Sequence, residues 1–308
     1  MYGKLLLGAT SRPAVQSMMT DSALNEKVVA RFVAGETAPS AVAAVRRLTS
    51  QGLKVTLDYL GEDITDLRQA DETVEAYRFL VEALAETRLA DGAEISVKLS
   101  AVGQSLGPDG PRASTDRAHK LVEHAASLGV DVTFDMEDHT TVDHTLSTVT
   151  ELRNEFPRVG CVLQSMLLRT EGDARDLAYA GSRVRIVKGA YAEPASVAHK
   201  KRAAVDAAYV RCVRSLVDGG AYPMIASHDT RLLDIAAFLF EASGRAQDAG
   251  EFQMLYGIRQ DEQLKRAQDG HTMRVYVPFG TDWYGYFTRR LAERPANLAF
   301  FVRALISR

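Results

Sequence analysis

Short runs rich in valine and isoleucine alternate with longer amphipathic stretches from residue 52 onward. Short apolar runs between turn-forming residues are typical of buried strands, and apolar positions spaced three and four apart are typical of helices. This rhythm predicts repeated strand–helix units and a parallel sheet. The predicted strands are Val55–Leu60, Ile95–Leu99, Val132–Met136, Cys161–Gln164, Val184–Lys188, Pro223–His228, Phe252–Leu255 and Arg274–Val277.

Eight parallel strands, each followed by a helix, can close into a barrel. An open doubly wound sheet usually has fewer strands and a glycine-rich phosphate-binding turn after the first strand. Neither GxGxxG nor GxxxxGK[ST] occurs in the sequence. We therefore predict an α/β protein with a (β/α)8 barrel at residues 52–308. A helical extension at residues 1–51 precedes it, with one apolar stretch at Val28–Val33 and a second at Ala41–Leu48. The insert Gly103–Arg112, which contains several Gly and Pro residues, predicts a surface loop that could form a lid.

Composition and charge exclude several classes of function. A formal net charge of −3 gives no reason to expect binding of nucleic acid. Cys161 and Cys212 lack the CxxC spacing and are too few for a disulfide framework or a zinc cluster, which favours a reducing cytoplasm. No apolar stretch approaches the roughly 18 residues that a membrane span needs. We expect a cytoplasmic protein that contacts membranes only peripherally.

Polar residues stand at nearly every predicted strand end, where barrel enzymes place their functional side chains. Lys98 could instead be solvated or paired with a carboxylate, and His228 could be a hydrogen-bonded core histidine. Asp135 could cap the next helix, although Asp138 is better placed to do so. The concentration of polar residues at one rim favours an active site. These residues are Asp58, Glu62, Lys98, Asp135, Glu137, Asp138, Gln164, Arg185, Lys188, Ser227, His228, Tyr256 and Tyr276.

Two adjacent arginines, Arg289 and Arg290, are the sharpest candidates for binding an anion. In the predicted helix Trp283–Glu293 they share one face with Tyr286 and Glu293, because these positions follow the i, i+3, i+4, i+7 spacing. This helix follows the last strand, so we expect it to begin near the barrel mouth. Two guanidinium groups can fix the orientation of one carboxylate, which predicts a small carboxylate substrate. The alternative is an exposed face on which the arginines pair with Glu293.

The stretch Arg185–Tyr191 ends the fifth strand with a cation, Lys188, and two small residues, Gly189 and Ala190. Residues this small would not obstruct a ligand, so a phosphate or a planar ring could lie against the backbone.

Matching segments occur in order at each barrel unit: Asp58–Glu62, Ser96–Ser100, Phe134–Asp138, Val162–Gln164, Arg185–Tyr191, Ala226–Asp229, Glu251–Gly257 and Tyr286–Glu293. Together they resemble the proline dehydrogenase family, whose members are flavin-dependent barrel enzymes that oxidise proline to pyrroline-5-carboxylate. The resemblance covers almost the whole chain, and Arg31–Thr37 is similar to the N-terminal part of the family. Ser227 stands where many members have threonine, and Ala192 where some have a bulkier aromatic residue.

The resemblance implies a role for each candidate residue. Asp135 and Arg185 are the polar groups nearest the reacting carbon, and Asp135 is a candidate base. Glu62 resembles a gating carboxylate that pairs with Arg289 over bound substrate. The implied substrate contacts are Lys98, Arg289 and Arg290 at the carboxylate and Tyr191, Leu255 and Tyr276 around the ring. The implied FAD contacts are Met136, Gln164, Arg185, Val187, Lys188, Gly189, Ala190, Ser227 and His228, and the family site contains no metal.

The resemblance is to the monofunctional bacterial type, because the chain ends at Arg308 without the aldehyde dehydrogenase domain of the bifunctional members. It implies the first step of proline catabolism, electron transfer to a membrane quinone, and a separate pyrroline-5-carboxylate dehydrogenase. Transient contact with the inner face of the membrane follows from the quinone. Relatives specific for hydroxyproline have a small residue in place of Tyr276, so L-proline is the expected substrate.

Three other functions are consistent with parts of the pattern. A metal-dependent lyase or aldolase would use Asp135, Glu137, His139 and His228 as ligands. A Schiff-base enzyme would use Lys98 or Lys188. A non-catalytic ligand-binding barrel would hold no chromophore. None of them accounts for the paired arginines together with Gln164 and the Lys-Gly-Ala strand end.

Overall fold

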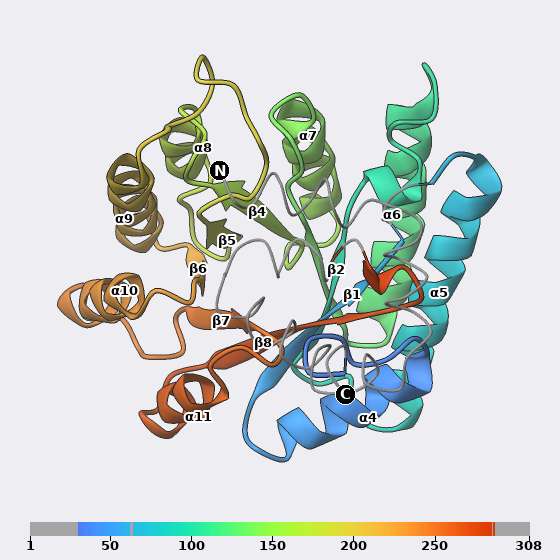
Figure 1. The fold of residues 1–308 in the computed structure, drawn as a ribbon, viewed down its shortest axis with the longest axis horizontal. Helices are drawn as coiled ribbons and strands as arrows, with labels where there is room; N and C mark the ends of the chain where they lie inside the picture. Colours follow the sequence, from blue (N-terminus) through green and yellow to red (C-terminus); the bar gives the residue numbers. More distant parts are fainter. Residues whose placement is uncertain (1–29, 62–63, 285, 287–308) are drawn as a thin grey trace, which may run out of the picture.

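The computed structural model describes residues 30–61, 64–284 and 286. Within them, parallel strands close into a barrel in sequence order, from β1 next to β2 around to β8 next to β1 (Figure 1). The predicted fold class is confirmed. The strands are β1 Lys54–Tyr59, β2 Ala93–Val97, β3 Asp131–Phe134, β4 Gly160–Gln164, β5 Arg183–Val187, β6 Tyr222–Ala226, β7 Glu251–Leu255 and β8 Met273–Phe279.

The predicted strands overlap the observed ones, but several of their ends are wrong. Leu60, Leu99, Met136, Lys188 and His228 lie beyond the observed strands, because the strands turn into loops at the barrel mouth. At β8 the error is the opposite. A proline usually ends a strand because it has no N–H to donate, yet β8 continues through Pro278, in register with Asp58 of β1.

Helices surround the barrel (Figure 1). In the described part of the chain they are α4 Ala38–Thr49, α5 Leu67–Glu86, η1 Ser100–Val102, α6 Gly110–Ser127, α7 Val142–Arg153, α8 Thr170–Asp176, α9 Arg202–Asp218, α10 Thr230–Ala242 and α11 Gln260–Gln268. The α4 helix precedes the first strand and contacts α5, β1 and β8. It therefore covers the seam where the last strand meets the first. No described helix has both the length and the apolar character needed to cross a membrane.

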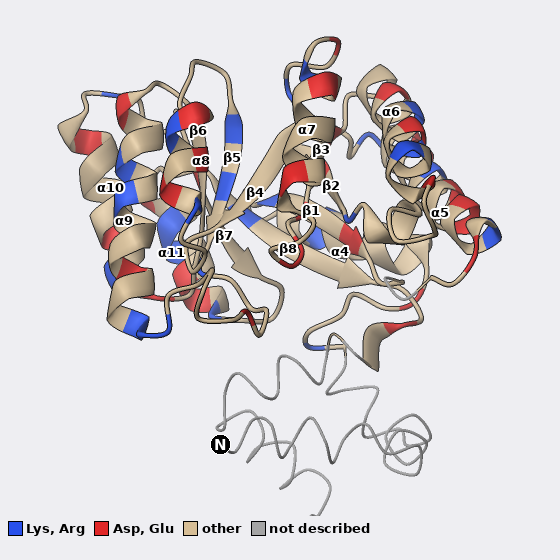
Figure 2. Ribbon diagram, turned by 90° about the horizontal axis from the view of Figure 1, so that it is seen from above, with Lys and Arg blue, Asp and Glu red and all other residues tan. Residues whose placement is uncertain are grey.

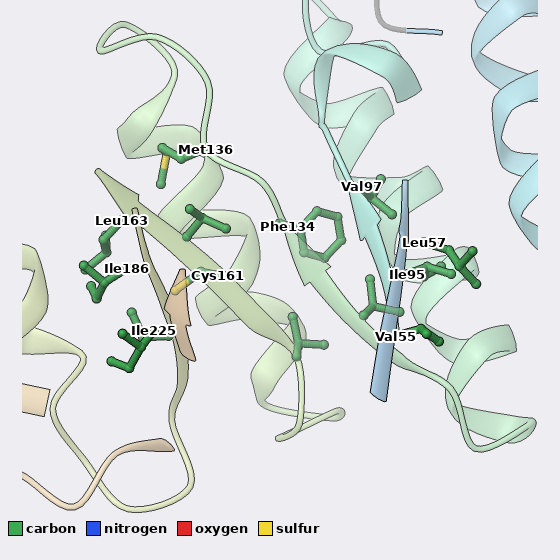
Figure 3. Packing of buried hydrophobic residues seen from close by; sticks show 14 of the residues in the cluster. Val55, Leu57, Ile95, Val97, Phe134, Met136, Cys161, Leu163, Ile186 and Ile225 are labelled. Carbon is green, nitrogen blue, oxygen red and sulfur yellow. The ribbon is translucent and has the colours of Figure 1, made fainter. Parts of the chain in front are cut away.

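The apolar core lies between the strands and the surrounding helices. Alternate strand residues such as Leu57, Ile95, Phe134 and Ile186 are fully buried there (Figure 3). The residues between them are polar, as in Lys54–Tyr59 (KVTLDY) and Arg183–Val187 (RVRIV). Since successive side chains of a strand point to opposite faces, these polar residues face the barrel interior. Figure 2 shows charged residues along the strands as well as on the helices, most clearly along β5.

The segment before α4 braces the mouth of the barrel. Ala34 N–H donates to the Pro278 carbonyl, and Gly280 N–H donates to the Gly35 carbonyl. At Gly257, where φ is +72°, a Cβ would overlap the Arg31 carbonyl. The predicted helical stretch at Val28–Val33 is wrong for residues 30–33, which form a turn and a bend where the Arg31 carbonyl packs closely against Gly257. The second predicted stretch is α4, capped by Thr37.

The insert after β2 is only partly a surface loop. Gln104 is buried, and α6 already begins at Gly110, two residues before the predicted loop ends. A Cβ at Gly110 would lie 2.5 Å from the Gln104 carbonyl oxygen, so the glycine allows the loop to fold back against the start of the helix. The exposed part is Ser105 to Asp109, with Leu106 half-buried.

Candidate active site

One cavity of about 1000 Å³ opens among the carboxyl ends of the strands. This volume is at the upper end of the range that encloses drug-sized ligands. The described residues to which the family resemblance assigns a substrate or cofactor contact all line it: Lys98, Asp135, Met136, Gln164, Arg185, Val187, Lys188, Gly189, Ala190, Tyr191, Ser227, His228, Leu255 and Tyr276. Of the other polar strand ends, Asp58 lines the cavity, whereas Glu137, Asp138 and Tyr256 do not. The predicted gate Glu62 and the predicted anchors Arg289 and Arg290 lie outside the described residues.

Asp135 is the centre of the polar contacts in this cavity. Its Oδ2 accepts a hydrogen bond from the Tyr276 hydroxyl at 2.6 Å, and its Oδ1 accepts one from Arg185 Nη1 at 2.7 Å. Burial, and then the negative charge of Asp135, raises the pKa of Tyr276 well above its usual value. The phenol therefore keeps its proton and acts as the donor.

Neither aspartate of this loop caps the following helix. Asp135 has the cavity contacts instead, and the residue at the N-cap of α7 is Thr141. The prediction that Asp138 fills this place is wrong, because its carboxylate accepts hydrogen bonds from the N–H and the hydroxyl of Thr140 and stabilises the preceding turn.

Lys98 is paired with carboxylates rather than solvated. Its Nζ lies 3.2 Å from Asp58 Oδ1 and 3.9 Å from Asp135 Oδ2, and the lysine side chain is 12% exposed. The sequence marks Asp58 only as a polar strand end, without a role. Its position two residues after Thr56, which faces the interior, could have indicated that it points into the cavity.

Arg185 is fixed by acceptors on several sides. Besides Asp135, its Nη1 donates to Ser96 Oγ at 2.9 Å, and its Nη2 donates to Glu94 Oε1 at 2.7 Å. The guanidinium carbon lies 5.3 Å from the centre of the Tyr276 ring. Burial lowers the pKa of Arg185, but Asp135 and Glu94 outweigh it and raise the pKa above its usual value. The buried Nε–H has no acceptor among the described residues, so it can donate to a bound group.

His228 is a hydrogen-bonded histidine that also lines the cavity. Its Nε2 accepts a hydrogen bond from Leu255 N–H at 3.1 Å, and its carbonyl accepts one from Arg259, so the ring is held while it lines the cavity. Gln164 Nε2 donates to the Glu137 carbonyl at 2.7 Å, and Ser227 Oγ accepts from Asp229 N–H. These contacts fix the side chains that form the wall of the cavity.

The far side of the cavity carries positive charge that sequence reasoning missed. Lys188 pairs with Asp206 at 2.6 Å and with Asp229 at 3.2 Å. The arginines lining this side that the sequence did not single out are Arg202, Arg231 and Arg259, and His199 lines it as well. All four lie in the loops after β5, β6 and β7 or in the first turn of the next helix, beyond the strand ends where the sequence predicts functional side chains.

The cavity suits a large cofactor that carries phosphate groups and a planar ring. Gly189 has φ +102°, and a Cβ there would lie 2.5 Å from Met166 Sδ, so this position requires glycine and leaves the backbone open. The unpartnered Arg185 Nε–H offers one donor, and the cations across the cavity match negatively charged phosphates.

The geometry also bears on the two catalytic alternatives. Glu137 accepts hydrogen bonds from the N–H and hydroxyl of Ser100, and His139 pairs with Glu193, so neither side chain joins Asp135. No cluster of three His, Cys, Asp or Glu suited to a metal occurs among the described residues. Both candidate lysines for a Schiff base lie between two carboxylates, whereas that chemistry needs a neutral amine.

Fold and site together define a (β/α)8 barrel enzyme with a polar mouth suited to a cofactor and a small polar substrate. The chain belongs to the proline dehydrogenase family, since the family model described as proline dehydrogenase matches residues 41–303. The resemblance seen in the sequence is thereby confirmed.

The curated relatives extend over nearly the same length. The chain is 40% identical to the proline dehydrogenase of Deinococcus radiodurans over 99% of this chain and 98% of the relative. It is 38% identical to proline dehydrogenase 1 of Bacillus subtilis strain 168, over 90% of each chain. Among solved structures, proline utilization A from Bdellovibrio bacteriovorus, inactivated by N-propargylglycine, matches with a TM-score of 0.81 and 26% identity. That match covers 87% of this chain and 33% of the other, so this chain spans about a third of that protein.

Proposed function

We propose that this enzyme oxidises L-proline to 1-pyrroline-5-carboxylate, with FAD as cofactor and a membrane quinone as the final electron acceptor. The observation that carries the proposal is the contact of Asp135 with Arg185 and Tyr276, beside Lys98, at the base of a cavity large enough for cofactor and substrate together. Membership of the family supports the choice of substrate.

In this proposal the substrate carboxylate binds near Lys98. That lysine already faces Asp58 and Asp135, so its single positive charge does not by itself attract a third carboxylate. Further positive charge is needed, and Arg289 and Arg290 of the sequence supply it. Tyr191, Leu255 and Tyr276 would surround the ring and exclude water, and Glu62 would close over the substrate by pairing with Arg289.

FAD supplies a two-electron acceptor that can take the hydride lost from the ring carbon beside nitrogen. Met136, Gln164, Val187 to Ala190, Ser227 and His228 would hold it, and the Arg185 Nε–H would donate to it. Arg185 thus offers fixed positive charge where negative charge develops.

The role proposed for Asp135 is orientation. Both of its oxygens already accept hydrogen bonds, one from Tyr276 and one from Arg185, so it fixes these two side chains relative to each other. The substrate amine must be neutral for its lone pair to stabilise the forming imine. The amine would release its proton to solvent before the oxidation, so the proposal assigns Asp135 the orientation of the site and not the amine proton.

The proposed pathway role is the first step of proline catabolism, with the product passed to a separate pyrroline-5-carboxylate dehydrogenase. Delivery of electrons to a quinone requires transient contact with the membrane, and we propose that the enzyme works at its inner face.

The visible spectrum of the purified protein tests the proposal directly. We expect flavin absorption bands that L-proline bleaches in the absence of oxygen, because the reduced cofactor loses its long-wavelength absorbance. D-Proline is the matched control and should leave the bands largely intact. A colourless protein, or flavin bands that L-proline leaves unchanged, would contradict the proposal.

Replacement of Tyr276 by serine should shift the substrate preference toward 4-hydroxyproline. The smaller side chain opens space beside the ring and offers a hydroxyl to the added polar group. We expect the ratio of kcat/KM for hydroxyproline to that for proline to rise by about tenfold, a typical effect of one such contact. Tyr276→Phe, which removes the hydrogen bond to Asp135 but keeps the ring, is the control. An equal rise with phenylalanine would show that steric space is not the cause.

A further inference from the structure

A buried ionic network lies in the barrel interior beneath the cavity. We define it as Glu94, Arg183, Arg185, Glu251 and Arg274, each at most 5% exposed. Glu94 of β2 meets both arginines of β5, with Arg185 Nη2 2.7 Å from Oε1 and Arg183 Nη2 2.7 Å from Oε2. Since β2 and β5 are not neighbours in the sheet, these contacts cross the interior.

The Glu94 carboxylate is held in one orientation. Thr56 of β1 donates to Oε1 at 2.6 Å, and Thr133 of β3 donates to Oε2 at 2.8 Å, so each oxygen accepts two hydrogen bonds. Burial raises the pKa of Glu94, but the charges of Arg274, Arg185 and Arg183 outweigh burial and hold the pKa well below its usual value. Glu94 is therefore a fixed negative charge at a fixed place.

This placement fixes the guanidinium group of Arg185, which lines the cavity. Glu94 accepts a hydrogen bond from Nη2, and Asp135 and Ser96 accept hydrogen bonds from Nη1. Among the three nitrogens of Arg185, Nε is the one that makes no hydrogen bond to the described residues. Without Glu94, the guanidinium could rotate and offer both terminal nitrogens to Asp135, which is the preferred geometry of an arginine with one carboxylate.

We propose that Glu94 is a positioning residue, which holds the Arg185 guanidinium in the orientation that binds the cofactor. This inference rests on the proposed function, in which Arg185 contacts FAD. Glu94 has no direct contact with the cavity and acts only through Arg185.

The test is the dissociation constant of FAD for the apoprotein, measured by quenching of flavin fluorescence. Four proteins are compared: wild type, Glu94→Gln, Arg185→Met and the double variant. We expect each single replacement to weaken FAD binding about tenfold and the double variant to bind no more weakly than Arg185→Met alone. The effects of replacing two residues that act through one contact are non-additive, whereas the effects of replacing independent residues add. A general loss of fold would lower the thermal midpoint without this dependence on Arg185.

Arg183→Met is the matched control, because it breaks the other ion pair of the same carboxylate and leaves Arg185 held. We expect its FAD affinity to stay within about twofold of the wild type, since Arg183 lies two residues before Arg185 and does not line the cavity. If Glu94→Gln alone fails to fold, the double variant Glu94→Gln with Arg183→Met replaces it, because it removes one charge of each sign from the interior. This double variant should show the tenfold loss of FAD affinity, whereas Arg183→Met alone should not.

The outcomes separate this inference from the proposed function. Wild-type protein that binds no FAD would overturn both. Wild-type protein that binds FAD and is bleached by L-proline, together with Glu94 variants of unchanged affinity, would overturn the positioning role alone. The positioning role would also be overturned if Glu94→Gln weakened FAD binding by the same factor in the wild type and in Arg185→Met.

Discussion

Replacement of Lys98 by methionine should raise the KM for proline about a hundredfold while FAD stays bound. A hydrogen bond between charged groups contributes about 1.5–3 kcal/mol, and each 1.4 kcal/mol corresponds to a tenfold change in affinity. Methionine keeps the length of the side chain, so the cavity wall is preserved. Steady-state kinetics with varied proline, at matched flavin content, measure the effect.

The control for this variant is Lys120→Met, which changes an exposed lysine of α6 far from the cavity lining. Its KM should equal that of the wild type. An unchanged KM in Lys98→Met would show that Lys98 serves only the ion pair with Asp58 and does not hold the substrate carboxylate.

Replacement of Arg274 by methionine should lower the free energy of unfolding by about 3–5 kcal/mol, the usual cost of removing one partner of a buried ion pair. Arg274 is 2% exposed, and its Nε and Nη2 donate to the two oxygens of Glu251 at 2.6 and 3.0 Å. Its Nη1 donates to the carbonyls of Val55 and Gly92. The replacement leaves Glu251 without this partner and removes one donor from each of these carbonyls.

Urea denaturation followed by circular dichroism measures this loss. Arg68→Met is the control, because Arg68 forms an exposed pair with Glu72 and such pairs contribute about 0–1 kcal/mol. The double variant Arg274→Met with Glu251→Leu should recover more than half of the loss, since no buried charge is then left without its partner. A loss in Arg274→Met no larger than in Arg68→Met would contradict the expectation.

The barrel could be predicted because its strands are short, apolar and regularly spaced, and because no glycine-rich turn indicated an open sheet. The site could be predicted in part because barrel enzymes place polar residues at strand ends. Lys98, Asp135 and Arg185 were found in this way, and the structure brings them together.

The buried ionic network was not predicted, although the sequence carries its signal. Glu94, Arg183 and Arg274 stand inside strands, between apolar residues. A parallel strand covered by helices on both faces is almost continuously apolar. Charges at every second position therefore require a polar inner face, as a closed barrel can provide. Which charges pair across the interior depends on strand tilt and register, and a single sequence does not specify these.

The helix α4 contacts both the first and the last strand of the barrel, which are synthesised at different times. During synthesis α4 and β1 emerge first, but β8, which pairs with β1 and contacts α4, emerges more than 200 residues later. Contacts so distant in sequence form late and slowly. The nascent chain must therefore keep an apolar helix face and an open strand edge until nearly all of the barrel has been made, and this interval is when aggregation and chaperone binding compete with folding.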